Sequence, residues 1–477
     1  MHSWSSVLAL ALVLGLSGCR QDAPAPRAMP AAEAPNVLLI TVDTLRADRL
    51  GTYGYPHATS PHIDALARES VVFERAIAAA STTAPAHASI MTSKYVREHT
   101  VGWMNGVTRL GHQETVAEVF RDAGWATAGF VGNFMLTRRL GFDRGFDRYD
   151  DDLPTPEPNR GRFYERIAEH TADRALAWLA AHEASGEEAA RPVFLWVHLQ
   201  DPHGPYSPPA GFADRIRIPP EADEEPLRVL QTDFALGGIP PYQRIDGLSR
   251  LSEYATRYAN EIVYADYWIG RLLEAVEGLH ADQPLRGTVV LLTADHGEAF
   301  GEGYRYFAHG HTTTPEVAHV PMILKAPGLS PGRNREIVHH VDVKPTLLEL
   351  AGLTSPFTQS GLPLARHHRS NEKLPDRIVY CDIGRELSAY TGGGFVRVKG
   401  TGFAWAVRES GTSDPAMAWQ SFQWREDGSF ERGASNAFGR KEEIRTYSRF
   451  AVQMAEAPPV VVDDVEHLRD LGYVIAE

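Results

Sequence analysis

Carboxylate and imidazole side chains stand directly after three apolar runs of the chain, where they could act together on one ligand. The runs and the polar residues that follow them are 37–42 with Asp43, 193–199 with Asp201 and His203, and 289–294 with Asp295 and His296. Any one of these residues alone would be typical of a helix cap or a solvated surface group. Three runs that all end on metal-ligating residue types predict a metal site. Carboxylate and imidazole without thiolate favour a hard-to-borderline divalent ion such as Zn²⁺ or Mn²⁺.

The three apolar runs read as strands that are buried on both faces, because apolar residues follow one another without alternation. Apolar residues recur at helical spacing in the segments 114–123, 163–181 and 254–276. Strands that alternate with helices predict a doubly wound, largely parallel α/β sheet with helices on both faces. In such a sheet, ligands bind outside the carboxyl ends of the strands, so the polar residues above would meet there.

The sequence pattern of the chain changes after about Leu374. Short segments at 378–381, 394–398 and 403–407 are separated by Gly, Ser and Asp, and a helical pattern returns near 464–471. We therefore expect a catalytic α/β domain over residues 35–373 and a smaller C-terminal subdomain with an antiparallel sheet over residues 374–477.

The first residues are typical of an export signal. The run 7–16 is too short to span a bilayer but has the length of a signal's apolar region. Leu16 to Cys19 (LSGC) resembles a bacterial lipobox, which implies that Cys19 receives lipid, although no Lys or Arg precedes Arg20. We expect a lipoprotein-type signal peptide over residues 1–19 and a Pro/Ala-rich linker over 20–34. The chain would then be an exported bacterial lipoprotein, membrane-anchored and facing the periplasm or the cell surface, with a plain signal peptide as the alternative.

Composition excludes several classes of protein. Lys and Arg number 47 against 61 Asp and Glu, giving a formal net charge of −14, which argues against a general nucleic-acid binder. The two cysteines, Cys19 and Cys381, are too few for a disulfide framework or a cysteine-rich zinc site. Histidines number 20, so imidazole rather than sulfur chemistry is indicated.

Several motifs resemble, in the correct order, the sulfatase branch of the alkaline phosphatase superfamily. They occur at residues 35–48, 60–66, 293–298, 309–310, 319–321, 341–346 and 471–474. The likeness covers nearly the whole chain from Pro35 onward. It implies an alkaline phosphatase-like fold and hydrolysis of sulfate, phosphate or phosphonate esters.

The nucleophile motif departs from that family. Sulfatases carry Cys-x-Pro-x-Arg, whose cysteine becomes a formylglycine, whereas the matching stretch 83–94 reads TAPAHASIMTSK. Thr83 takes the cysteine position, His87 the arginine position, and Lys94 the position of the basic residue after the motif. No formylglycine can form here. Ser81 and Thr82 are alternative nucleophiles, and Thr83 could also serve as a helix N-cap.

Phosphoethanolamine and phosphoglycerol transferases of the superfamily bind one metal through residues that these positions resemble. The resemblance implies that Asp43, Thr83, Asp295 and His296 hold one divalent metal (Zn, Mn or Ca). A threonine hydroxyl becomes a workable nucleophile when a metal lowers its pKa.

The same resemblance assigns the proton transfers. His203, in the stretch HGPY, and His309 match active-site histidines, and either would protonate the leaving oxygen, while Lys94 and His87 would balance charge. Weaker claims belong to His311 as a supporting residue, Asp201 as a ligand of a second metal, and His198, which we interpret as a satisfied core histidine.

Three functions remain open from the sequence. The leading one is a metal-dependent sulfatase-family hydrolase that acts on a small-molecule, glycan or lipid ester through Thr83. The second is a phosphotransferase that acts on lipid or glycan, although such enzymes usually carry several transmembrane helices and this sequence shows none. The third is an inactive relative that only binds esters or glycans.

Overall fold

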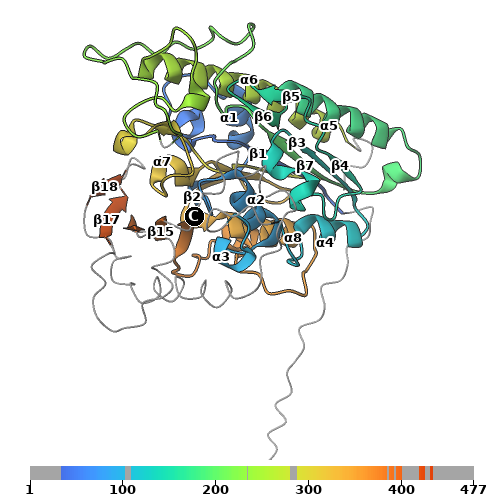
Figure 1. Ribbon diagram of the computed structural model, residues 1–477. Coiled ribbons are helices and arrows are strands. Elements are labelled where there is room, and N and C mark those ends of the chain that lie inside the picture. Colours follow the sequence, from blue (N-terminus) through green and yellow to red (C-terminus); the bar gives the residue numbers. More distant parts are fainter. Residues whose placement is uncertain are drawn as a thin grey trace, which may run out of the picture.

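A mixed nine-stranded sheet forms the centre of the molecule (Figure 1). The structure, a computed structural model, describes residues 34–102, 109–233, 235–279, 287–383, 386–391, 394–399, 418–424 and 430–432. The strand order is β11-β2-β12-β8-β1-β7-β3-β4, and β13 also pairs with β2. The strands are β1 (Asn36–Val42), β2 (Val71–Ile77), β3 (Ala126–Val131), β4 (Arg148–Asp150), β7 (Val193–Leu199), β8 (Thr288–Ala294), β11 (His319–Val320), β12 (Met322–Lys325) and β13 (Gly332–His339).

The three predicted apolar runs form adjacent strands at the middle of this sheet. β1 pairs in parallel with β7 on one side and with β8 on the other, and Val42 lies opposite both Leu199 and Ala294. Every residue of β1 and β7 is buried, which is why these strands do not alternate between apolar and polar residues. This register places the residues after all three strands at one edge of the sheet.

Helices cover both faces of the sheet (Figure 1). On one face α5 and α1 pack against the long helix α6, and on the other α2 packs against α8. The predicted doubly wound, largely parallel α/β fold is therefore confirmed, with β11 and β12 as antiparallel members. The helices are α1 (Pro61–Arg68), α2 (Thr83–Thr92), α3 (Val96–His99), α4 (Val116–Asp122), α5 (Ala168–Glu183), α6 (Leu251–Gly278), α7 (Pro315–Ala318), α8 (Val343–Leu350) and α9 (Leu364–Ser370).

One predicted helix begins later than its sequence pattern indicates. The pattern starts at Phe163, but α5 begins at Ala168, because residues Arg160–Glu165 form strand β6. β6 pairs with β5 (Thr155–Glu157) in a two-stranded hairpin. The Asp201 carboxylate accepts the Ala168 N–H at 2.6 Å and so marks the start of the helix.

A five-stranded antiparallel sheet follows the main sheet, as the sequence pattern after Leu374 predicts. Its strands are β14 (Val379–Asp382), β15 (Glu386–Thr391), β16 (Gly394–Lys399), β17 (Ala418–Trp424) and β18 (Phe430–Arg432). β14 is joined to the main body by a buried ion pair between Arg97 and Asp382. A further two-stranded sheet consists of β9 (Ala299–Phe300) and β10 (Tyr306–Ala308).

Some predictions concern segments that the structure leaves undescribed. The signal peptide and nearly all of the linker lie there, as do the strand expected at 403–407 and the helix expected at 464–471. The domain boundaries at 35 and 374 stay predictions. Within the described part of the chain, no helix has both the length and the apolar character needed to cross a bilayer.

Candidate active site

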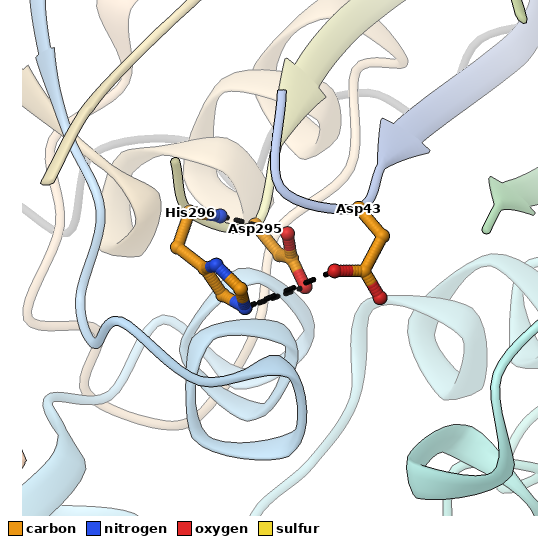
Figure 2. A group of neighbouring side chains, drawn as sticks. All are labelled: Asp43, Asp295 and His296. Carbon is orange, nitrogen blue, oxygen red and sulfur yellow. Dashed lines mark hydrogen bonds and ion pairs between the residues drawn. The ribbon is translucent and has the colours of Figure 1, made fainter. Parts of the chain in front are cut away.

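Three metal-ligating side chains converge where β1 and β8 end (Figure 2). Asp43 follows β1, and Asp295 and His296 follow β8, so the parallel register brings them together. One ligand atom from each lies within 4.8 Å of the other two. His296 Nε2 is 3.5 Å from Asp295 Oδ2 and 3.9 Å from Asp43 Oδ1. All three side chains are fully buried.

The atoms that face one another in this cluster lack hydrogen-bond partners. Asp43 Oδ1, Asp295 Oδ2 and His296 Nε2 are all buried and unpaired. Buried polar atoms normally have a hydrogen-bond partner, so three unpaired atoms that lie close together indicate that a ligand binds between them. His296 Nδ1 donates to the carbonyl of Gly297 at 3.0 Å, which leaves Nε2 of the neutral ring with a lone pair. Two carboxylates and one imidazole fit a divalent cation.

The ionisation of the two carboxylates also favours a bound cation. Burial, and then the charge of Asp43 beside it, raise the pKa of Asp295 well above its ordinary value. Burial also disfavours ionisation of Asp43, but His198, His203 and His296 outweigh that effect and lower its pKa. Without a cation, one proton is therefore favoured on the carboxylate pair. A divalent cation would let both carboxylates ionise.

Thr83 is the first residue of α2, and its helix begins beside the cluster. Its carbonyl accepts a hydrogen bond from His87 Nδ1 at 2.8 Å, and the same nitrogen is 3.8 Å from Asp295 Oδ2. The first turn of α2 therefore adjoins the carboxylates. The N-cap position belongs to Thr82, not to Thr83, and Ser81 Oγ donates to the carbonyl of Thr312 at 2.6 Å. Ser81 is thus engaged elsewhere, and Thr83 is not the cap.

His87 lies beside the cluster and Lys94 beyond the far end of α2, and their expected charge-balancing roles stay predictions. His87 is fully buried, and burial first, then His198, lower its pKa well below 6.5, so the ring is neutral. Its Nε2 accepts from the Thr41 hydroxyl at 3.0 Å, because Nδ1 carries the hydrogen given to Thr83. Lys94 follows the other end of α2, about 15 Å along the helix axis from Thr83. Its ammonium pairs with Glu98 at 3.5 Å.

His203 and His309 both lie at the site. The His309 ring centroid is 4.6 Å from that of His296 and 5.1 Å from that of His203. His309 Nδ1 contacts Glu298 Oε1 at 3.3 Å. Burial opposes protonation of His309, but Glu298 outweighs it and raises the pKa of the ring. Burial lowers the pKa of His203 to about 3. His309 is therefore the ring better suited to hold a second proton.

Two weaker predictions fall outside the cluster. The buried Asp201 carboxylate accepts the Ala168 N–H and lies beside Glu261. Burial, and then the charge of Asp201, raise the pKa of Glu261. Asp201 is not a member of the metal-ligating group found among the described residues. His311 Nε2 contacts the carbonyl of Asp233 at 2.9 Å and so supports a loop.

Three residues of the site were missed or undervalued by sequence reasoning. Asn133 Nδ2 donates to Asp43 Oδ2 at 2.8 Å, but the strand that precedes Asn133, β3 (ATAGFV), is too rich in small residues to resemble a buried strand. Glu298 belongs to the DHGE motif and could have been assigned from it. The sequence predicts His198 to be a satisfied core residue, but its Nε2 is unpaired and lies 3.6 Å from Asp43 Oδ2.

Comparison with known proteins agrees with this geometry. The family model described as Sulfatase matches residues 35–353. The chain is 26% identical over 388 residues to an arylsulfatase of Clostridium perfringens, an alignment that covers 69% of this chain and 77% of the relative.

Solved structures share the fold. One is a protein in complex with its substrate D-glucosamine-2-N,6-O-disulfate, with a TM-score of 0.63 at 17% identity, covering 92% of this chain and 98% of that one. Another is the phosphonate monoester hydrolase of Agrobacterium radiobacter, with a TM-score of 0.62 at 18% identity, covering 86% and 95%. The expected alkaline phosphatase-like fold is confirmed. Because the family model spans more than half of the chain, the protein belongs to the sulfatase family and is an ester hydrolase of that family.

Proposed function

We propose that this protein is a metal-dependent hydrolase of sulfate, phosphate or phosphonate esters whose nucleophile is Thr83. The main support is that unpaired atoms of Asp43, Asp295 and His296 converge beside the helical turn that begins at Thr83. Relatives named for sulfate and phosphonate esters support this substrate range. Cys381 is buried in β14, far along the chain from the motif, which supports a mechanism without formylglycine.

Asp43, Asp295 and His296 would hold the cation, with Thr83 as the fourth ligand. When bound, a divalent cation supplies positive charge that acidifies a nearby hydroxyl and polarises an ester oxygen. Thr83 Oγ1 gives up its proton to solvent and forms a bond to the sulfur or phosphorus atom. The bond to the leaving oxygen breaks, and its electron pair stays on that oxygen.

His309 is the proton donor in this scheme. Glu298 holds Nδ1, so Nε2 is the atom that delivers a proton to the leaving oxygen. A water then attacks the sulfur or phosphorus atom and gives a proton back to His309 Nε2. The bond to Thr83 Oγ1 breaks, and the hydroxyl recovers its proton. His203 lies against His309 and would contact the departing group.

Turnover by the full chain tests this function. Aryl phosphate monoester, phosphodiester, phosphonate and sulfate substrates are compared with Mn²⁺ or Zn²⁺ present. We expect turnover of at least one ester class by the parent and a loss of about 1,000-fold or more in Thr83→Ala. Thr92→Ala, the same change at the other end of α2, is the matched control and should keep parental turnover. Equal rates in Thr83→Ala and the parent would refute the nucleophile.

We also propose that the protein is exported and anchored to the membrane through lipid on Cys19. The support is the LSGC sequence after an apolar run of signal-peptide length. Labelled fatty acid should be incorporated by the parent and not by Cys19→Ala, and the variant should leave the membrane fraction. Equal labelling of both would rule out this anchor.

A further inference from the structure

The β5–β6 hairpin carries a positive charge to the neighbourhood of the catalytic histidines. Asn159 Nδ2, at the turn of the hairpin, donates to the carbonyls of Tyr242 and Arg244 at 2.7 and 2.8 Å. These two hydrogen bonds clamp the hairpin onto the loop that begins with the 3₁₀ turn Pro241–Gln243. These side-chain hydrogen bonds of Asn159 also position the next residue, Arg160.

The Arg160 side chain is held between two aromatic rings. Its guanidinium carbon lies 4.2 Å from the ring centroid of Tyr242 and 4.6 Å from that of Phe163. Both rings are buried, so the cation–π contacts are formed in a largely desolvated setting. Glu157 Oε1 accepts from Arg160 Nε at 2.8 Å and fixes the rotation of the planar group. This is a preorganised guanidinium.

A continuous row of rings connects Arg160 to the metal-ligating cluster. His296 contacts His309 at 4.6 Å, His309 contacts His203 at 5.1 Å, and His203 stacks on Tyr242 at 6.4 Å between centroids. Tyr242 then contacts Arg160. The two histidines therefore stand between the cluster and the guanidinium. The departing group of an ester lies on the side of the residue that protonates it, and Arg160 lies on that side.

Arg160 is also close enough to act electrically on both histidines. Burial lowers the pKa of His203, and the charges of His309 and Arg160 lower it further, against the pull of Asp43. The same Arg160 charge opposes the effect of Glu298 on the pKa of His309. Arg160 is therefore near both of the rings that would face the departing group.

We propose that Arg160 is a specificity residue that binds an anionic group on the departing part of the ester. The preferred substrates are then esters whose leaving group carries a carboxylate, or another acidic group of the same geometry, in addition to the ester itself. Planar guanidinium and planar carboxylate are matched for charge-assisted hydrogen bonding. The inference rests on the proposed function, because it assigns the leaving group of that reaction.

The test compares two leaving groups of similar size and differing in charge. 4-Carboxyphenyl and 4-carbamoylphenyl esters, of the acid that the enzyme hydrolyses best, are assayed with the full chain. We expect the parent to prefer the carboxylate ester by about tenfold or more in kcat/KM, and Arg160→Met to lose this preference through a higher KM. Arg160→Lys should retain part of it, because Lys keeps the charge without the planar fork.

Two further variants separate recognition from folding. Arg160→Met leaves the buried Glu157 without its partner, so the double variant Arg160→Met with Glu157→Gln removes both charges and should show the same loss of preference. Arg244→Met, an exposed arginine on the clamped loop, should keep the parental preference. A preference that survives in Arg160→Met, or no preference in the parent, overturns the inference while hydrolysis still stands. A parent that cleaves neither ester contradicts the proposed function, and the inference falls with it.

Discussion

His309 Nδ1 lies 3.3 Å from Glu298 Oε1, and this carboxylate is fully buried. The other oxygen of Glu298 accepts the hydroxyl hydrogen of Tyr206 at 3.1 Å. The buried carboxylate therefore lies directly beside the His309 ring, and its negative charge favours the protonated ring. The pairing both fixes the ring and raises its pKa, which is what a proton donor to a leaving oxygen requires.

Glu298→Gln should therefore slow the departure of poor leaving groups. We expect kcat/KM for an alkyl ester, which reports formation of the intermediate, to fall by about 100-fold, while kcat/KM for an activated nitrophenyl ester, which needs little protonation, falls much less. Tyr206→Phe removes the other hydrogen bond to the same carboxylate and serves as the control with a smaller loss. Steady-state rates over a series of leaving groups measure the effect. Equal losses for good and poor leaving groups would contradict the role of His309.

Metal binding should stabilise the parent and not Asp295→Asn. A cation at 100 times its Kd adds about 2.7 kcal/mol to the free energy of unfolding, because it binds only the native state. Asp295→Asn also removes the repulsion from Asp43, so its metal-free form should melt at or above the Tm of the metal-free parent. Asp201→Asn changes a buried carboxylate outside the cluster and should keep the metal-induced rise in Tm. A metal-induced rise in Asp295→Asn equal to that of the parent would refute the site.

Asn133 should increase the affinity for the metal without binding the metal itself. Its amide donates to Asp43 Oδ2, and loss of such a supporting hydrogen bond typically costs about 10–100-fold in affinity. Asn133→Ala is therefore expected to raise the Kd for Zn²⁺ or Mn²⁺ by that factor, as measured by competition with a chromophoric chelator. Asn334→Ala, on β13, is the control and should bind as the parent does. Unchanged affinity in Asn133→Ala would show that Asp43 needs no such support.

Glu165 should make the parent less stable as the pH rises. Burial, and then Glu157 and Asp201, raise its folded-state pKa from 4.5 to about 8. Between these values the unfolded chain has lost the proton and the folded chain keeps it, so stability falls with rising pH and levels off above 8. Glu165→Gln removes this term, worth at most about 1.4 kcal/mol per pH unit.

Denaturant unfolding of the parent and Glu165→Gln between pH 5 and pH 9 measures this difference. The free energy of unfolding of the variant should increase relative to that of the parent up to about pH 8, and the difference should then stay constant. Glu183→Gln, at an exposed position of α5, should follow the parent at every pH. Parallel curves for the parent and Glu165→Gln would show that Glu165 ionises normally in the folded protein.

The central strands and the metal-ligating residues could be predicted from the sequence because one physical pattern produces both. Runs such as 193–199 are buried on both faces of the sheet, and in a parallel sheet their ends meet at one edge. The convergence of Asp43, Asp295 and His296, the candidate metal ligands, follows from that geometry.

Residues that act through tertiary contacts could not be read in the same way. Asn133 follows a strand of small residues, and the position of Lys94 depends on the length of α2, which the motif alone does not state. The sequence pattern predicts that the helix begins within strand β6, because Phe163 and Ile167 also fit a helical spacing. The role of Arg160 is visible only once that hairpin is seen clamped against Tyr242.

Detection of a covalent intermediate on Thr83 is the most direct test of the proposed nucleophile. The full chain is mixed with a substrate, quenched in acid within one turnover and digested with trypsin, and the peptide 76–94 is analysed by mass spectrometry with site localisation. We expect a phospho- or sulfo-group on Thr83, absent from Thr83→Ala. With an activated ester the group should build up in Glu298→Gln, because breakdown of the intermediate also uses His309 as the proton acceptor. A group on Ser81 or Thr82, or an unmodified peptide during active turnover, would contradict the proposed nucleophile.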